Sequence, residues 1–346
     1  MTSKNRRLAL GSAAIAAASA LALTACSADT EASADATGSS SASAGAHVLK
    51  VAALTPGTTT DGGFNQSVLD ALTTLQDEGL IEFEIRDEIA DSATAEPIMT
   101  DYASQGYDLI IAHGIELGDA AFAVAQEFPD VMFTASGGAD ILDQYTDNVE
   151  TWTYSTSDAG YLSGYIAGAT GLSPVARVES MELDFVTATD TAFLKGLADA
   201  NPAAQALDVI YTGSFDDAEA AASATSGLIT QGAKLVYTTG DGIATGVGSA
   251  AAEAGVATVG VSEAAGDAAA SVNVSTVNLD MTPIFRTWVD EVAAGDFGGR
   301  GVTSTIANGG LVPTDINAVD GADSDTATKV DTLIAGLKDG SITLDD

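Results

Sequence analysis

Cysteine, histidine and positive charge are scarce in this sequence. Its 346 residues include one cysteine and two histidines, and 12 Lys and Arg stand against 49 Asp and Glu. A single cysteine excludes an intramolecular disulfide and a metal site built from several cysteines. The formal net charge of −37 makes the chain repel phosphate backbones and anionic membrane surfaces, so nucleic acid is not an expected partner.

Motifs of the common hydrolases and nucleotide-binding enzymes are also missing. The sequence has no Gly-x-Ser-x-Gly elbow and no His-Glu-x-x-His pair, and its Gly-rich pieces lack the Gly-Lys-Ser/Thr ending of a P-loop. His113 is the only histidine in the part expected to fold, and we interpret it as a hydrogen-bonded residue at a strand end. The sequence therefore predicts no enzyme activity, no metal and no cofactor.

Residues 1–25 are predicted to be an export signal. Three basic residues precede an Ala- and Leu-rich run that ends at Leu23, and no acidic residue interrupts it. Leu23-Thr24-Ala25-Cys26 resembles a bacterial lipobox, in which the cysteine carries lipid. Residues 26–47 are mainly Ser, Ala, Thr, Gly and Asp and predict a flexible linker. We expect the protein to be anchored through Cys26 to the extracytoplasmic face of the cell membrane.

From Val48 onward, short β-rich segments alternate with helical ones, which predicts an α/β fold with parallel sheets. The first series has strands at 48–54, 81–86, 108–112 and 131–135, and helices at 63–78, 95–105 and 116–127. A second series has strands at 182–187, 207–213, 234–238, 256–261 and 270–275, and helices at 190–200, 216–231 and 242–254. The two series predict two similar lobes with a cleft between them.

The remaining segments are expected to cross between the lobes. A strand at 149–154 leads into a helix at 159–170, and a helix at 280–294, a strand at 302–306 and a helix at 325–338 follow the second series. We assign residues 48–155 and 276–298 to lobe 1, and residues 156–275 and 299–346 to lobe 2. The glycine spacing of the helix at 159–170 predicts close packing of that helix on a sheet.

Two aromatic loops at strand ends are candidate ligand contacts, because ligands of open α/β sheets collect at the carboxyl ends of the strands. Asp61-Gly62-Gly63-Phe64-Asn65-Gln66-Ser67 follows the first strand, and Gly213-Ser214-Phe215-Asp216-Asp217 is its counterpart in the second half. Each phenylalanine alone is more simply explained by packing within its own lobe. As a pair facing across a cleft, they would stack on both sides of a planar ring, each contributing about 0.5–1.5 kcal/mol beyond burial.

Two further loops lie on the same predicted edge. His113-Gly114 ends the strand at 108–112, and Gly240-Asp241-Gly242 ends the strand at 234–238. Glycine at such a position lets the backbone approach a neutral ligand.

Together these features resemble the basic membrane protein (BMP) family of solute-binding lipoproteins, which includes purine nucleoside receptors of ABC transporters. The resemblance covers about residues 48–312 and implies a type I periplasmic-binding-protein fold, in which two Rossmann-like lobes are joined by three crossings. It also implies that Phe64 and Phe215 sandwich the base, that Asn65 reads its edge and that Gly240 lies under the ligand. The matching pieces are Phe64-Asn65-Gln66-Ser67, Tyr102-Ala103-Ser104-Gln105-Gly106-Tyr107-Asp108-Leu109-Ile110, Glu127-Phe128-Pro129-Asp130-Val131, Gly160-Tyr161-Leu162-Ser163-Gly164-Tyr165, Gly213-Ser214-Phe215-Asp216-Asp217 and Gly260-Val261.

The sequence departs from the nucleoside-binding members at three positions. Thr55-Pro56 stands where they carry an Asp, Ser262 where an Asp receives the ribose hydroxyls, and Val277-Asn278 where they carry a Lys. A buried hydroxyl left without its acceptor costs about 1–3 kcal/mol. Glu263, Asp241 and Asp61 are the carboxylates that could replace the missing ones.

We therefore predict a lipid-anchored, monomeric binding protein that closes on a small planar solute, a purine nucleoside or related base, and delivers it to an ABC permease. One alternative is a sugar receptor of the same fold. Another is a surface hydrolase acting on nucleosides or glycans, which would need a carboxyl group with a raised pKa in the cleft.

Overall fold

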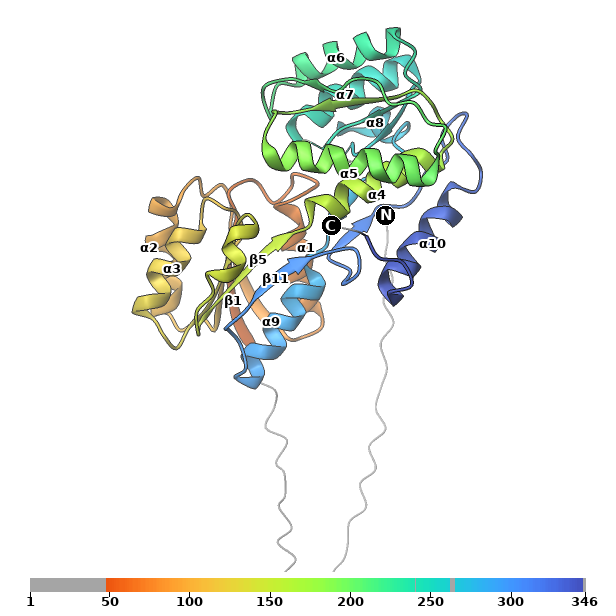
Figure 1. Cartoon of the computed structure of the whole chain (residues 1–346). Coiled ribbons are helices and arrows are strands. Elements are labelled where there is room, and N and C mark those ends of the chain that lie inside the picture. The colour runs from red at the N-terminus through yellow and green to blue at the C-terminus, as the bar shows by residue number, and fades with distance from the viewer. Residues whose placement is uncertain (1–47, 240, 262–264, 345–346) are drawn as a thin grey trace, which may run out of the picture. The chain divides into compact units, whose positions relative to one another are not determined.

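Two parallel sheets, each covered by helices on both faces, form the framework of the chain from residue 48 onward (Figure 1). The computed structural model describes residues 48–239, 241–261 and 265–344. The sheet of lobe 1 has the strand order β11-β5-β4-β3-β1-β2, and all its pairs are parallel. Its strands are β1 (Leu49–Leu54), β2 (Ile81–Arg86), β3 (Leu109–Ala112), β4 (Met132–Ser136), β5 (Val149–Tyr154) and β11 (Gly301–Ser304).

Four helices bury the two faces of this sheet. Helices α2 (Ser92–Ser104) and α3 (Gly118–Glu127) pack on one face, and α1 (Gln66–Asp77) and α9 (Thr282–Ala294) pack on the other. The central strand β3 is buried at every residue, as its sequence Leu-Ile-Ile-Ala predicts for a strand covered on both faces. A short 3₁₀ helix, η1 (Ala139–Asp143), follows β4.

Lobe 2 has a four-stranded sheet in the order β7-β6-β8-β9. Helices α4 (Thr156–Ala169), α5 (Asp184–Ala200) and α10 (Thr326–Asp339) pack on one face. Helices α6 (Ala218–Thr230), α7 (Asp241–Ala254) and α8 (Asp267–Ala270) pack on the other. The strands are β6 (Val175–Glu179), β7 (Ile210–Tyr211), β8 (Leu235–Tyr237) and β9 (Ala257–Val259). This doubly wound plan confirms the predicted fold class.

Three segments connect the lobes. The chain passes from β5 into α4, from lobe 2 through β10 (Val277–Leu279) into α9, and from β11 back through β12 (Leu311–Pro313). Strands β10 and β12 pair antiparallel, and the Ser155 N–H donates to the Ser304 carbonyl oxygen at 2.9 Å. Neighbouring crossings are therefore hydrogen-bonded to one another.

Several predicted elements are wrong. The strand of lobe 2 expected at 182–187 is β6, at 175–179, and residues 184–187 belong to α5. The range 270–275, where a strand is expected, begins at the last residue of the short helix at 267–270 and continues with an isolated bridge from Asn273 to Thr258. Strand β11, which we placed in lobe 2, pairs with β5 and extends the sheet of lobe 1.

The glycine-rich face of α4 packs on a helix and not, as predicted, on a sheet. A Cβ atom at Gly164 would overlap the carbonyl group of Phe193 in α5, and one at Gly196 would overlap that of Tyr161 in α4. The two helices therefore cross backbone to backbone. No helix in the described ranges is both long and apolar enough to cross a bilayer.

Candidate ligand-binding cleft

Two adjoining cavities lie between the lobes. The first, the aromatic chamber, has a volume of about 550 Å³ and is lined by Phe64 and Tyr154 from lobe 1 and by Phe185, Phe215 and Tyr237 from lobe 2. The second, the polar chamber, measures about 560 Å³ and is lined largely by hydroxyl and amide side chains. The two chambers share five lining residues, Gly62, Gly63, Thr276, Asn278 and Leu279, and so form one continuous cleft.

The wall on lobe 1 is a cluster of three rings that pack against one another. The distance between ring centroids is 3.9 Å from Phe64 to His113, 5.1 Å from His113 to Trp152 and 6.5 Å from Phe64 to Trp152. His113 Nε2 is 3.0 Å from the Phe64 carbonyl oxygen, which can only accept, so this nitrogen carries the proton. Burial lowers the pKa of His113 to about 3 and keeps the ring neutral. The imidazole therefore supports Phe64 from behind.

The loop that presents Phe64 is folded around Asp61. Its carboxylate accepts the backbone N–H groups of Gly63, Asn65 and Gln66 at 2.9–3.0 Å and the Asn65 side-chain amide at 2.8 Å. Burial raises the pKa of Asp61, but these donors outweigh it and hold the pKa below its ordinary value. Asn65 in turn accepts the Gly57 N–H at 3.3 Å. Asp61 thus orders the loop and lines neither chamber, whereas Asn65 lines the aromatic chamber.

The wall on lobe 2 is a pair of exposed rings. Phe215 is 39% exposed and lies parallel to Phe185, which is 50% exposed, with 6.4 Å between centroids and 1° between planes. Phe215 precedes α6, whose first turn is capped by the Asp217 carboxylate. A Cβ atom at Gly242 would lie 2.5 Å from the Phe215 carbonyl oxygen, so glycine is required where α7 passes this loop.

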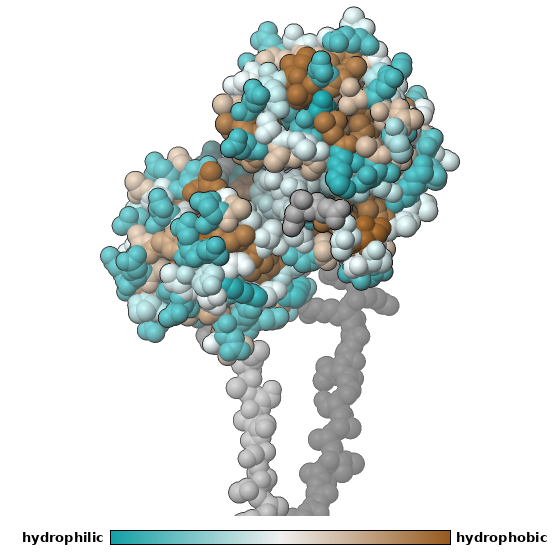
Figure 2. Space-filling model, viewed as in Figure 1, coloured by the Kyte–Doolittle hydropathy of each residue, from teal (hydrophilic) through white to brown (hydrophobic). Residues whose placement is uncertain are grey.

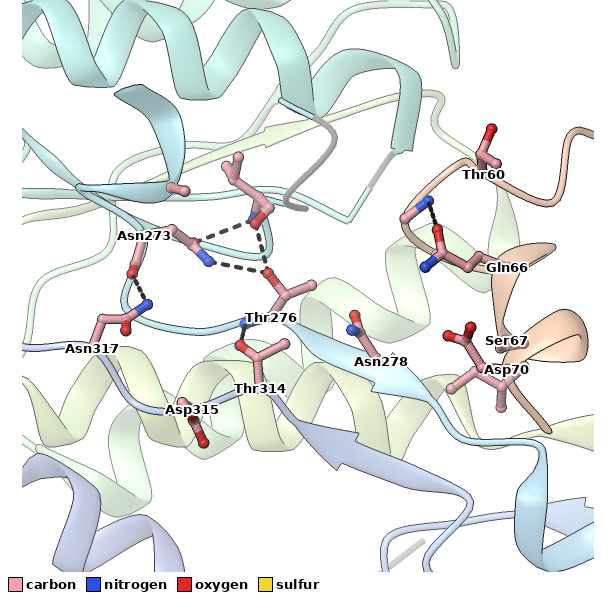
Figure 3. Close-up of a pocket in the computed structure, with 15 residues that line it drawn as sticks. Thr60, Gln66, Ser67, Asp70, Asn273, Thr276, Asn278, Thr314, Asp315 and Asn317 are labelled. Carbon is pink, nitrogen blue, oxygen red and sulfur yellow. Dashed lines mark hydrogen bonds between the residues drawn. The ribbon is translucent and has the colours of Figure 1, made fainter. Parts of the chain in front are cut away.

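Polar groups on both sides of the polar chamber come from the crossings and from α1 (Figure 3). Thr314 Oγ1 accepts the Thr276 N–H at 3.0 Å, and the Asn273 amide donates to Thr276 Oγ1 at 3.1 Å. Asp70 lies on the opposite side, and Asn278 lies between the two groups. These side chains can exchange hydrogen bonds with a polyhydroxylated part of a ligand.

No lysine or arginine lines the described part of either chamber, whereas Asp70, Asp315 and Glu116 do. A ligand that carries phosphate or carboxylate would find no positive partner among these residues. In the same described ranges, no group of three His, Cys, Asp or Glu side chains is placed to hold a metal ion. The electrostatics therefore disfavour an anionic ligand.

One buried carboxyl group lies just behind the cleft. Glu179 is fully buried, and burial raises its pKa to about 8. Its Oε2 accepts the Thr239 hydroxyl at 2.6 Å, and Thr239 lines the aromatic chamber. Neighbouring Asp190 is paired with Arg177. Because Glu179 lines neither chamber, this raised pKa does not provide the exposed carboxyl group that a hydrolase of nucleosides or glycans would need.

The other predicted site residues are distributed as follows. Gly114 lines the aromatic chamber, while His113 lies beneath Phe64 and lines neither chamber. Asp241 opens α7. Gly240, Ser262 and Glu263, as well as Cys26, lie outside the described residues. The sequence reasoning missed Ile115, Tyr154 and Phe185, which all line the aromatic chamber.

Comparison with known proteins identifies relatives of this chain. The profile of the Bmp family, described as "ABC transporter substrate-binding protein PnrA-like", matches residues 48–314. The "ABC transporter nucleoside-binding protein BmpA" of Lactococcus lactis subsp. cremoris is 29% identical over 208 residues, which cover 59% of this chain and 58% of that protein. The chain thus matches a little over half the length of this curated relative.

Solved structures extend the likeness to nearly the whole folded part. A solute-binding protein of an ABC transporter system from Conexibacter woesei is 38% identical, has a TM-score of 0.81 and covers 86% of this chain and 99% of its own. A periplasmic ribose ABC transporter protein from the same organism is 18% identical, with a TM-score of 0.57 and coverage of 84% and 96%. The second likeness shows the fold alone.

Proposed function

The chain belongs to the Bmp family of PnrA-like ABC transporter substrate-binding proteins, and on that premise we propose that it binds an uncharged purine nucleoside or related base between Phe64 and Phe215. The observation that carries the proposal is that these two rings, one from each lobe, line the same cavity. Offset stacking on both faces of a planar base contributes about 0.5–1.5 kcal/mol per ring beyond burial.

The polar chamber complements this aromatic sandwich. Its hydroxyl and amide groups are suited to the sugar of a nucleoside, and it adjoins the aromatic chamber through Thr276 and Asn278. The absence of Lys and Arg from the described lining argues for nucleosides over nucleotides, because a buried phosphate without a positive partner is strongly disfavoured. The name of the Lactococcus lactis relative, a nucleoside-binding protein, supports the same ligand class.

We further propose that the protein works outside the cytoplasm, anchored by lipid on Cys26, and passes its ligand to a membrane permease without altering it. Supporting this are the lipobox-like Leu23-Thr24-Ala25-Cys26 and the family of the chain. Replacing Cys26 with Ser should release the protein from the membrane fraction, and a variant that stays there would contradict the anchor.

The ligand is tested by calorimetry and thermal shift with inosine, guanosine, adenosine, the free bases and ribose. A ligand at 100 times its Kd stabilises a protein by about 2.7 kcal/mol, which gives a readily measured rise in Tm. Phe64→Ala and Phe215→Ala should each weaken nucleoside binding at least about tenfold. Tyr145→Ala is the matched control, since Tyr145 is 42% exposed but lines neither chamber.

Unchanged nucleoside affinity in both phenylalanine variants would overturn the sandwich. If ribose binds and none of the nucleosides does, the alternative of a sugar receptor is favoured. Chromatography of the recovered ligand tests the absence of turnover, and a cleaved nucleoside would show that the protein is an enzyme.

A further inference from the structure

Exposed apolar side chains are concentrated in the aromatic chamber. Eight large apolar residues of the described chain are exposed, and four of them line this one cavity, namely Ile115, Tyr154, Phe185 and Phe215. Apolar patches also interrupt the polar surface elsewhere on both lobes (Figure 2). What distinguishes these four is that they converge on one cavity from both lobes, and contiguous exposed apolar surface marks interaction sites.

A planar ring held between Phe64 and Phe215 leaves three of these four side chains outside the sandwich. Tyr154 lies beside Phe64, with 6.4 Å between ring centroids, and the other two are Ile115 and Phe185. Ile115 is 72% exposed and Phe185 is 50% exposed, and neither is one of the two rings that the sandwich requires. They come from opposite lobes, Ile115 from the loop after β3 and Phe185 from the first turn of α5. The aromatic chamber therefore offers more apolar surface than the two faces of a bare base would cover.

The loop that carries Ile115 is held in place on both sides. The Gly114 N–H donates to the Ser136 hydroxyl at 2.7 Å, and the Glu116 carbonyl accepts the Ser92 hydroxyl at 2.7 Å. Gly114 has a φ of 131°, a conformation that favours glycine, and a Cβ atom there would lie 2.8 Å from Pro56. An exposed isoleucine on so well-fixed a loop is pre-organised for contact.

We propose that Ile115 and Phe185 form an apolar subsite, and that the preferred ligand is a planar, uncharged ring system carrying an apolar substituent. This inference rests on the proposed function, because the substituent is attached to the ring held between Phe64 and Phe215. Burial of the substituent against Ile115 and Phe185 removes apolar area from water on both sides, and this adds affinity that an unsubstituted nucleoside lacks.

The test compares adenosine with N6-benzyladenosine and 8-benzylaminoadenosine by calorimetry on the full-length protein. The two derivatives place the same apolar group at different edges of the ring, so the orientation of the base need not be known. At least one derivative should bind about tenfold more tightly than adenosine. Ile115→Ser and Phe185→Ser should each lower that affinity ratio to within about threefold of unity.

Leu183→Ser is the matched control, because Leu183 is 37% exposed on the segment next to Phe185 but lines neither chamber. It should leave the ratio unchanged. If both derivatives bind the unaltered protein no more tightly than adenosine does, the subsite is overturned. Binding of adenosine in the same experiment still upholds the sandwich. A ratio that survives both substitutions, or that falls as much in Leu183→Ser, also overturns it. If none of the three compounds binds, the proposed function falls and the subsite falls with it.

Discussion

The two aromatic walls of the cleft are built in opposite ways. In lobe 1, Phe64 rests on His113 and Trp152, and both of these are buried in the core. In lobe 2, Phe215 is accompanied by Phe185, and both rings are exposed. The first wall is therefore fixed by packing before any ligand arrives, whereas the second gains much of its burial from the ligand. A pre-organised wall loses less side-chain entropy on binding.

A buried titratable group lies behind each wall, His113 in lobe 1 and Glu179 in lobe 2, and burial keeps both neutral near pH 7. His113 has its pKa lowered to about 3, and Glu179 has its pKa raised to about 8. The signs of the linkage are opposite. As the pH falls from 6.5 toward 3, His113 becomes protonated in the unfolded chain but stays neutral in the folded one. This group therefore reduces the stability of the folded state over that range. Glu179 reduces stability as the pH rises from 4.5 through 8.

The largest expected effect comes from removing Trp152, a buried ring of the wall on lobe 1. Trp152 is 1% exposed, and Trp152→Ala should lower the free energy of unfolding by about 3–5 kcal/mol because it leaves a cavity in the core. It should also weaken nucleoside binding, since Phe64 loses a ring that packs against it. Denaturant titration and calorimetry measure the two effects, and Trp152→Phe serves if the alanine variant does not fold.

Trp288→Ala is the matched control for this prediction. Trp288 is equally buried in the same cluster, but its ring stacks on Phe285 with 5.2 Å between centroids and its Nε1 donates to Glu150. We expect a similar loss of stability with nucleoside affinity retained in the folded protein. If both variants lose affinity alike, the contact between Trp152 and Phe64 has no special role in binding.

The next effect concerns the buried carboxyl group behind the second wall. Glu179→Gln keeps an acceptor for the Thr239 hydroxyl but cannot ionise. The unaltered protein should lose stability between pH 4.5 and 8 relative to this variant, by on the order of 3 kcal/mol. The charged groups around Glu179 are Asp190 and Arg177, which stay paired in the variant.

Denaturation measured from pH 5 to pH 9 tests this difference. The exposed Glu182→Gln serves as the control and should leave the pH profile of the unaltered protein as it is. Parallel profiles for the unaltered protein and Glu179→Gln would show that Glu179 ionises normally in the folded state.

The sequence predicts lobe 1 well because its strands are unambiguous. Leu109-Ile110-Ile111-Ala112 is a continuous apolar run with turn residues on both sides, and it forms β3 as expected. The carboxyl ends of parallel strands share one edge, and this is why Phe64 and Gly114, far apart in sequence, line one chamber. The position of a residue at this edge does not determine whether its side chain points into the cleft. Asp61 was expected to face the ligand, but its carboxylate turns inward to the loop.

Lobe 2 shows how a binding surface can be mistaken for a strand. Met181, Leu183 and Phe185 alternate with polar residues, a spacing typical of a half-buried strand, and a strand is predicted at 182–187. In the structure Phe185 faces the aromatic chamber from the first turn of α5. The true strand β6 was overlooked because Arg177 interrupts it, and only the fold reveals that Asp190 pairs with this arginine. The same misassignment concealed Phe185 as a site residue.

The smallest expected effect on stability is that of Phe185→Ala. It tests most directly whether the two walls differ in how firmly they are packed. Phe185→Ala should change the free energy of unfolding by less than about 1 kcal/mol, because a side chain that is 50% exposed contributes little to the core. The free energy of unfolding without ligand, measured by denaturant titration, therefore isolates the packing of the wall from its contact with the ligand. A loss as large as that of Trp152→Ala would mean that Phe185 is a structural residue and that the second wall is as firmly fixed as the first. A negligible loss means that the ring of Phe185 is not needed to stabilise the folded chain.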